Sequence, residues 1–219
     1  MSSIKLIDVC KTYRTIRPSG ITTKNVLSDF NLEIKQNDFI VLAGASGIGK
    51  STILNIIANI LKPDSGMVLY NEKTINAIKN YRPSVVGFMP CYDTLINSLT
   101  VLENMRLACD IAKSNNEVVN DIDHILQMLD DVKLRYIIDS FPLELSSGEY
   151  KRVCLGRVLL QNSPFMLFDE PTSNLDRENV EIILNIFKSD IFNDHGCLLA
   201  THDPRLIDIG KERGKVIEL

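Results

Sequence analysis

Residues 44–51 read GASGIGKS, a stretch that satisfies the pattern G-x-x-x-x-G-K-[ST]. A strand-like apolar run, residues 39–43, precedes it, and a run of helical character, residues 52–60, follows it. Glycines let the backbone wrap closely, so that successive N–H groups, ending at a helix N-terminus, point at phosphate oxygens. A match of this length in this context seldom arises by chance. The stretch therefore predicts a phosphate-binding loop in an α/β domain.

The chemistry expected of this loop is the binding of a nucleoside triphosphate together with Mg²⁺. Lys50 would bridge the β- and γ-phosphates, and the hydroxyl of Ser51 would take one position on the metal ion. We expect the nucleotide-binding residues of this stretch to be Gly44, Ala45, Ser46, Gly47, Ile48, Gly49, Lys50, Ser51 and Thr52.

A second motif, FMLFDE at residues 165–170, is an apolar strand that ends in two carboxylates. The tip of a strand in an open α/β sheet faces the ligand crevice. Asp169 would then reach Mg²⁺ through water, while Glu170 would orient and deprotonate the attacking water. Alone, the pattern also fits an acidic loop start. Beside the phosphate loop, the metal and base roles are favoured.

Further apolar runs alternate with helical patterns along the chain. The runs at 85–89, 165–169, 197–201 and 216–219 are typical of strands buried on both faces. Apolar positions of helical period fall at Val118, Ile122, Ile125, Leu126 and Leu129, and again at Val180, Ile183, Leu184 and Phe187. Such alternation predicts a mostly parallel sheet. With the phosphate loop, the predicted fold class is an α/β P-loop NTPase.

Two regions interrupt this pattern. Strand-like pieces at 4–9 and 26–34, separated by the polar stretch 15–24, predict a small N-terminal antiparallel β subdomain with a flexible hairpin or loop. Few strand signals occur between 92 and 161, which predicts an inserted helical subdomain. We expect one domain over 1–219, with 1–91 and 162–219 forming the nucleotide-binding core and its β subdomain.

Composition excludes several classes of function. The 219 residues carry a net charge of −4, which leaves no global basic field to hold nucleic acid. The apolar runs are too short to span a bilayer, and the opening residues MSSIKLIDVC lack the features of a secretory signal. Five scattered cysteines fit reduced thiols better than disulfides or a zinc site. We therefore expect a cytoplasmic protein without a nucleic-acid partner.

The stretch LSSGE at 145–149, followed by YKRVCLGRVLLQNSPFMLFDEPTSNLD at 150–176, resembles the nucleotide-binding subunits of ABC transporters. The resemblance covers nearly the whole chain. LSSGE is similar to the family's signature motif, usually LSGGQ or LSGGE, and SNLD at 173–176 is similar to its D-loop. The pattern is most similar to the subgroup that serves macrolide export, lipoprotein release and antimicrobial-peptide efflux.

The resemblance implies roles for particular residues. The signature residues Ser146, Ser147, Gly148 and Glu149 would bind the γ-phosphate of ATP held by an opposite subunit, and Asp176 would couple the two sites. His202, in THD, resembles the histidine that contacts the γ-phosphate and positions Glu170 and the water. Tyr13, in KTY, resembles the aromatic residue that stacks on adenine. Taken singly, Tyr13 also fits an ordinary half-buried aromatic, and His202 an ordinary loop histidine.

Two departures from the family pattern stand out. Cys91 occupies the position at which the family usually has a glutamine that touches Mg²⁺ and the attacking water. A neutral thiol is a poor ligand for a hard cation, so slow hydrolysis or altered coupling is expected. Ser147 replaces the first signature glycine, and its β-carbon adds bulk near the opposing ATP.

The resemblance also implies partners. Each ATP would bind between two chains in a head-to-tail pair, either a homodimer or two paired ATPase subunits. The ATP-driven closing and opening of this pair would drive conformational change in an integral membrane permease subunit. A groove for that permease would be lined by Tyr92, Leu95, Ile96, Leu99 and residues 101–104, unless these residues only form the core of the helical subdomain. The chain would lie on the inner face of the cell membrane. An alternative is a regulatory subunit that uses the same ATP switch to signal and moves no solute.

Overall fold

The computed structural model describes residues 2–18, 20–78, 81–113 and 121–219. Its centre is a five-stranded sheet in the order β6-β7-β8-β3-β9, in which every pair of neighbours is parallel. The strands are β3 (Phe39–Ala43), β6 (Val86–Met89), β7 (Phe165–Asp169), β8 (Gly196–Thr201) and β9 (Lys215–Glu218). The five apolar runs of the sequence thus form one parallel sheet, as predicted.

Helices and a second sheet cover the two faces of this sheet. Side chains alternate along a strand, so Phe39 and Val41 of β3 enter one core, while Ile40 and Leu42 enter the other. The first core includes α6 and α7; the second includes α1 and the antiparallel sheet. These helices are α1 (Lys50–Ile57), α6 (Arg177–Lys188) and α7 (Pro204–Arg213). Burial on both faces explains why these strands are apolar throughout.

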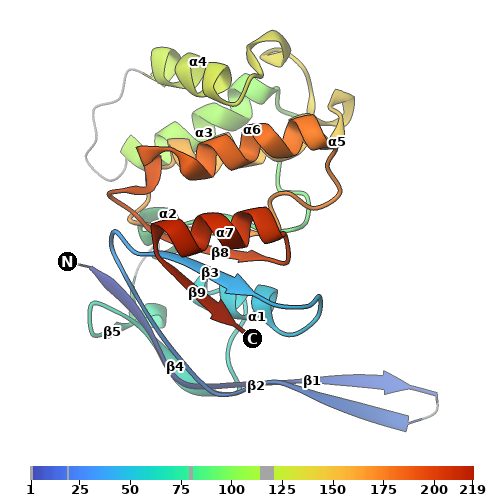
Figure 1. Ribbon diagram of the computed structural model, residues 1–219, viewed down its shortest axis with the longest axis vertical. Helices are drawn as coiled ribbons and strands as arrows, with labels where there is room; N and C mark the ends of the chain where they lie inside the picture. The colour runs from blue at the N-terminus through green and yellow to red at the C-terminus, as the bar shows by residue number, and fades with distance from the viewer. Residues whose placement is uncertain (1, 19, 79–80, 114–120) are drawn as a thin grey trace.

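The antiparallel sheet has the order β2-β1-β4-β5. Its strands are β1 (Ser3–Arg17), β2 (Gly20–Lys35), β4 (Ser65–Tyr70) and β5 (Lys73–Thr74). Of the two forms expected at 15–24, a hairpin or a loop, the structure has the hairpin, and its strands include most of this stretch because Thr15 pairs with Thr22 and Ile16 with Ile21. β-Branched side chains favour such cross-strand pairs and outweigh the Pro and Gly signals, which mark only the turn. The resulting hairpin projects from the body of the molecule (Figure 1).

Helices dominate residues 92–161, as the sequence predicts. They are α3 (Val101–Lys113), α4 (Asp121–Asp131) and α5 (Ser147–Leu160), with single turns at Arg135–Ile137 and Pro142–Glu144. The helical positions from Ile122 to Leu129 lie in α4, whereas Val118 lies outside the described residues. Figure 1 places these helices at the end of the molecule opposite the β1–β2 hairpin.

The remaining elements are short. α2 (Tyr81–Val85) precedes β6, and single 3₁₀ turns occur at Ile75–Ala77 and Asp190–Phe192. Across the described ranges, no helix has both the length and the apolarity needed to cross a membrane.

Candidate nucleotide-binding and catalytic site

The glycine-rich loop lies between the end of β3 and the start of α1, as predicted. Gly47 has a φ of 78° and Gly49 a φ of 127°, backbone conformations that L side chains rarely adopt. At Gly49 a β-carbon would also lie 2.9 Å from Cγ1 of Val26. The exposed residues between Gly44 and Gly49 therefore form a tight turn that ends at the N-terminus of α1. Such a turn is suited to an anion.

Lys50 is the first residue of α1, and only 4% of its side chain is exposed. Its ammonium donates hydrogen bonds to the carbonyl oxygens of Gly44 at 2.7 Å and Ala45 at 3.1 Å. It also lies 3.3 Å from Oε1 of Glu170. A buried charge is costly unless it is paired, and these three oxygens supply the pairing. Lys50 thus links the glycine-rich loop to the acidic end of β7.

Ser51 and Asp169 meet across the tips of α1 and β7. The Ser51 hydroxyl donates a 3.0 Å hydrogen bond to Oδ1 of Asp169, and the carboxylate is buried. Burial raises the pKa of Asp169, although the hydrogen bond from Ser51 opposes the shift. A hydroxyl beside a carboxylate is the hard-oxygen donor pair that suits Mg²⁺, which takes few protein ligands and fills its remaining positions with phosphate and water. These residues therefore fit the metal ion.

Glu170 follows β7 with a φ of 50°, in the left-handed region. Its N–H donates to the carbonyl of Ala200 at 2.9 Å, which extends the sheet by one residue. Its half-buried carboxylate lies between the Lys50 ammonium and His202, whose Nδ1 is 3.0 Å from Oε1 and 2.9 Å from Oε2. A non-glycine residue in this conformation costs about 1–3 kcal/mol and persists only where its surroundings hold it.

Tyr13 lies at the far side of the glycine-rich loop, on β1, and is partly exposed. Its hydroxyl is 3.3 Å from Oγ1 of Thr52. The β1–β2 register places Lys24 opposite Tyr13, and Lys24 donates a 2.8 Å hydrogen bond to the carbonyl of Gly47. The two strands of the hairpin thus frame the loop from the side.

These groups line one cleft of about 550 Å³. We call it the nucleotide cleft. It brings together predicted residues from both halves of the sequence. They are Tyr13, Ser46, Gly47, Gly49, Lys50, Ser51, Thr52, Cys91, Glu170 and His202. The lining residues that the sequence did not predict are Thr15, Lys24, Val26, Ser173 and Asn174. Of these, Ser173 and Asn174 belong to the quoted SNLD stretch, so a signal for them was present, whereas the others depend on the hairpin register.

Cys91 lies just beyond β6 and enters the cleft from the side of Asp169. Burial raises the pKa of the Cys91 thiol, and the charge of Asp169 and a hydrogen bond to it raise the pKa further. The thiol is therefore protonated at neutral pH. A protonated thiol is a poor ligand for a hard cation such as Mg²⁺.

The described residues that line the nucleotide cleft include none from the signature segment, residues 145–149. Ser146 caps α5, because its Oγ accepts the Glu149 N–H, and the Glu149 carboxylate accepts the Ser146 N–H at 2.8 Å. Tyr136 donates to the same carboxylate, and this bond, with those from Ser146, lowers the pKa of Glu149. The exposed Ser147 follows at the start of the helix. The N-terminus of α5 is thus fixed in shape at a distance from the chain's own cleft.

Asp176 caps α6 and lies next to the signature segment. It accepts hydrogen bonds from the Asn179 N–H at 2.9 Å and from its amide group at 2.7 Å, and these bonds lower the pKa of Asp176. A β-carbon on Gly148 would lie 2.3 Å from Cγ of Asn179. Glycine at 148 therefore allows the N-terminus of α5 and the first turn of α6 to approach closely.

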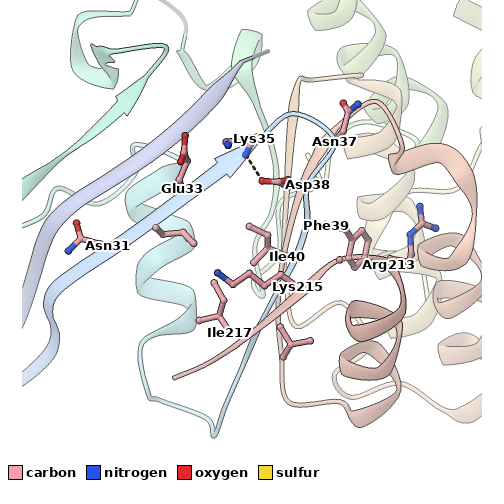
Figure 2. Close-up of a pocket in the computed structure, with 13 residues that line it drawn as sticks. Asn31, Glu33, Lys35, Asn37, Asp38, Phe39, Ile40, Arg213, Lys215 and Ile217 are labelled. Atoms are coloured by element: carbon pink, nitrogen blue, oxygen red, sulfur yellow. Dashed lines mark hydrogen bonds between the residues drawn. The ribbon is translucent and has the colours of Figure 1, made fainter.

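A wider groove of about 720 Å³ lies elsewhere, between β2, β3 and β9 (Figure 2). Lys35, Asp38, Arg213 and Lys215 line it together with the apolar side chain of Ile217. All of the predicted site residues lie outside the lining described for this groove. Its size alone does not make it a reaction site, and the chemistry is concentrated in the smaller nucleotide cleft.

A glycine-rich loop between strand and helix, with a serine and an aspartate meeting beside it, defines a P-loop nucleoside triphosphatase. Comparison with known proteins narrows this class. The family model described as ABC transporter matches residues 27–173. The chain belongs to the ABC transporter family, as an ATP-binding subunit with ATPase activity.

Relatives and solved structures agree with this assignment. The lipoprotein-releasing system ATP-binding protein LolD of Saccharophagus degradans is 37% identical over 190 residues, which is 84% of this chain and 81% of the relative. The putative hemin import ATP-binding protein HrtA of Staphylococcus haemolyticus is 30% identical, with 99% and 96% covered. A dimeric structure of the bacterial ABC transporter cassette MJ0796 superposes with a TM-score of 0.82 at 30% identity, covering 99% of this chain and 94% of that one. The expected family, fold class and likeness to the lipoprotein-release subgroup are confirmed.

Proposed function

We propose that two such ATPase subunits close head to tail on two Mg-ATP and that hydrolysis reopens them, so that the cycle drives a separate integral membrane subunit. The observation that carries this proposal is the position of the signature segment. Its capped helix N-terminus suits a phosphate, yet it lies outside the chain's own nucleotide cleft. A second chain would bring the segment to the first chain's ATP. The structurally similar MJ0796 cassette is itself described as a dimer.

Within each cleft, the described contacts support a separate role for each residue in binding or hydrolysing ATP. Lys50 exchanges its loop carbonyl and Glu170 partners for phosphate oxygens, and Tyr13 supports the adenine. Ser51 and Asp169 would hold Mg²⁺, and the bound ion would supply positive charge beside the phosphates. Once Lys50 is engaged by ATP, the Glu170 carboxylate is free to take a proton from the attacking water. His202, beside that carboxylate, positions it and reaches the γ-phosphate.

The proposed docking site for the membrane subunit is a groove of about 490 Å³ between β6 and the helical region. Phe88, Tyr92, Thr94 and Arg157 line it, and Arg157 donates a 2.8 Å hydrogen bond to the carbonyl of Thr94. Of the residues expected here, the exposed Tyr92 lines the groove, whereas the exposed Ile96 and the half-buried Leu99 lie outside its described lining. Within 101–104, Val101 and Asn104 are buried. Leu95 is buried, so it belongs to the core. The groove thus offers an aromatic ring beside a cation, and we propose that the subunit binds there on the inner face of the cell membrane.

Tyr92→Asp is expected to disrupt this docking. Replacing a central aromatic anchor with a charge costs about 2 kcal/mol or more, which weakens binding by about 30-fold or more. The test is affinity purification of the tagged chain from detergent-solubilised membranes, with the integral membrane partner identified by peptide mass spectrometry. Ile16→Asp, an exposed change at the tip of the hairpin, is the matched control. Equal recovery of the same membrane protein with both variants would exclude this groove.

Cys91→Gln is expected to raise ATP turnover by about 10-fold, because an amide oxygen binds Mg²⁺ and orients water whereas the protonated thiol does neither. The measurement is steady-state ATPase activity across a Mg²⁺ titration, with Cys91→Ala as the control that removes the thiol without adding a ligand. If turnover and Mg²⁺ dependence are the same in all three proteins, residue 91 does not limit hydrolysis.

A regulatory subunit that signals through a membrane partner without moving a solute is the second candidate. The specific observation in its favour is the thiol of Cys91 beside Asp169, since slow hydrolysis suits a switch better than a pump. Substrate efflux measured with wild type and Glu170→Gln separates the two functions. A transport subunit loses efflux with the variant.

A further inference from the structure

Lys151 joins two parts of the molecule that the proposed reaction uses separately. It lies on α5, two residues beyond the signature segment, and its side chain reaches the loop after β7. The ammonium donates to the carbonyl of Glu170 at 3.0 Å, to the carbonyl of Ser173 at 2.6 Å and to the hydroxyl of Ser173 at 2.6 Å. An ammonium has three N–H groups, so these contacts use all of its donors.

Several hydrogen bonds in the loop after β7 converge on the carbonyl oxygen of Glu170, which Lys151 contacts. The carbonyl of Glu170 also accepts the N–H of Ser173 at 3.2 Å and its hydroxyl at 2.9 Å. Glu170 has its φ in the left-handed region, so its backbone relies on such contacts to keep the side chain directed at Lys50 and His202. Lys151 supplies the one charged donor to this carbonyl among the described contacts.

The surroundings of Lys151 argue against an ordinary surface lysine. The side chain is half-buried, and burial lowers the pKa of Lys151. Desolvating an ammonium is unfavourable unless its donors are satisfied. A methionine at this position would fill similar space without that penalty, so the charge serves the loop rather than the packing.

We infer that Lys151 is a positioning residue, which fixes Glu170 and the start of the D-loop for hydrolysis and links them to the signature end of α5. This inference rests on the proposed function, in which the signature segment touches the partner's ATP while Glu170 acts in the chain's own cleft. Each Lys151 then connects one ATP of the pair to the reaction centre of the other. A shift of the N-terminus of α5 on binding the partner's ATP would thereby be transmitted to Glu170 by the Lys151 side chain.

The first test compares Lys151→Met, which removes the donors, with Lys151→Arg, which retains charge and donors. We expect kcat for ATP hydrolysis to fall by about 10- to 100-fold in the methionine variant, while KM for ATP stays within about three-fold, because positioning rather than ATP binding is lost. The arginine variant should recover most of the rate. Lys188→Met, which alters an exposed lysine of α6, is the control and should behave as wild type.

Thermal unfolding of the same proteins separates positioning from folding. A methionine variant that unfolds near the wild-type temperature and binds ATP normally, yet hydrolyses slowly, supports the inference. The double variant Lys151→Met/Ser173→Ala should lose less rate than the two single changes combined, since both remove the contact between the Lys151 ammonium and the Ser173 hydroxyl, although Ser173→Ala also removes the bond from that hydroxyl to the Glu170 carbonyl. A methionine variant with kcat within two-fold of wild type overturns the inference, as does one whose kcat and ATP binding fall together.

Mixed pairs then test which site Lys151 serves. Differently tagged chains allow a pair with Lys151→Met in one chain and Glu170→Gln in the other, so that the intact Glu170 shares a chain with the altered lysine. We expect slow hydrolysis in this pair. When both changes are in one chain and the other chain is wild type, the one intact site should hydrolyse ATP normally, which gives about half the rate of the wild-type pair. The reverse pattern overturns the inference, whereas a wild-type protein that never pairs with Mg-ATP overturns the proposed function instead.

Discussion

Glu170→Gln is expected to bind Mg-ATP, to form a stable pair of subunits and to hydrolyse ATP about 100- to 10,000-fold more slowly than wild type. Glutamine keeps the shape of the side chain but cannot accept a proton from water. It also ends the ion pair with Lys50, whose ammonium lies 3.3 Å from Oε1, so the lysine is freer to engage phosphate. ATP binding should therefore survive the change while turnover does not.

Size-exclusion chromatography with and without Mg-ATP measures the pairing, and phosphate release measures turnover. Glu178→Gln, which alters an exposed carboxylate in the first turn of α6, is the matched control and should turn over normally. A Glu170→Gln protein that remains monomeric at saturating Mg-ATP contradicts the head-to-tail mechanism. Repeating the measurement with the membrane subunit present excludes weak pairing of isolated chains as the cause.

Lys50→Ala is expected to weaken ATP binding by at least about 100-fold, because truncating a buried, hydrogen-bonded charge typically costs several kcal/mol. The methyl group of alanine cannot neutralise the phosphates, so the site loses its one buried cation among the described lining residues. The Glu170 carboxylate also loses its cation and repels the γ-phosphate. Both effects act in the same direction.

Fluorescent-nucleotide titration measures this loss, with Lys188→Ala as the control for removing a positive charge. Thermal unfolding should show that the variant remains folded, since removing Lys50 also removes the cost of burying its ammonium. Retention of wild-type affinity would show that nucleotide binds without Lys50, which contradicts the assignment of residues 44–51 as the phosphate-binding loop.

The central sheet could be predicted from the sequence because its signal is local. β3 and β7 begin and end at the predicted residues, since their side chains are apolar on both faces and polar loops follow at once. The N-terminal hairpin could not be predicted in full, because its strands continue through polar residues that face solvent. There the pairing of Thr15 with Thr22 determines the structure, and composition does not reveal it.

The candidate site divides in the same way. Lys50, Ser51 and Glu170 follow from short motifs, because neighbours in sequence fix their geometry. Lys24 reaches the loop only through the register of β1 and β2, and Lys151 reaches Glu170 only because α5 lies beside the loop that follows β7. Both depend on contacts between distant segments, which a single sequence does not contain. Whether each residue performs its proposed role stays a prediction for the variants above.

The strand order also has a consequence for biosynthesis. β3, which carries the glycine-rich loop, has β8 and β9 as its neighbours, and both come much later in the chain. During translation the loop is made well before either partner of its supporting strand, because β8 (Gly196–Thr201) and β9 (Lys215–Glu218) follow β3 by more than 150 residues. Such non-local pairing slows folding and leaves apolar strands exposed meanwhile. A nascent chain of this protein is therefore expected to gain ATP affinity only after β8 and β9 have been made.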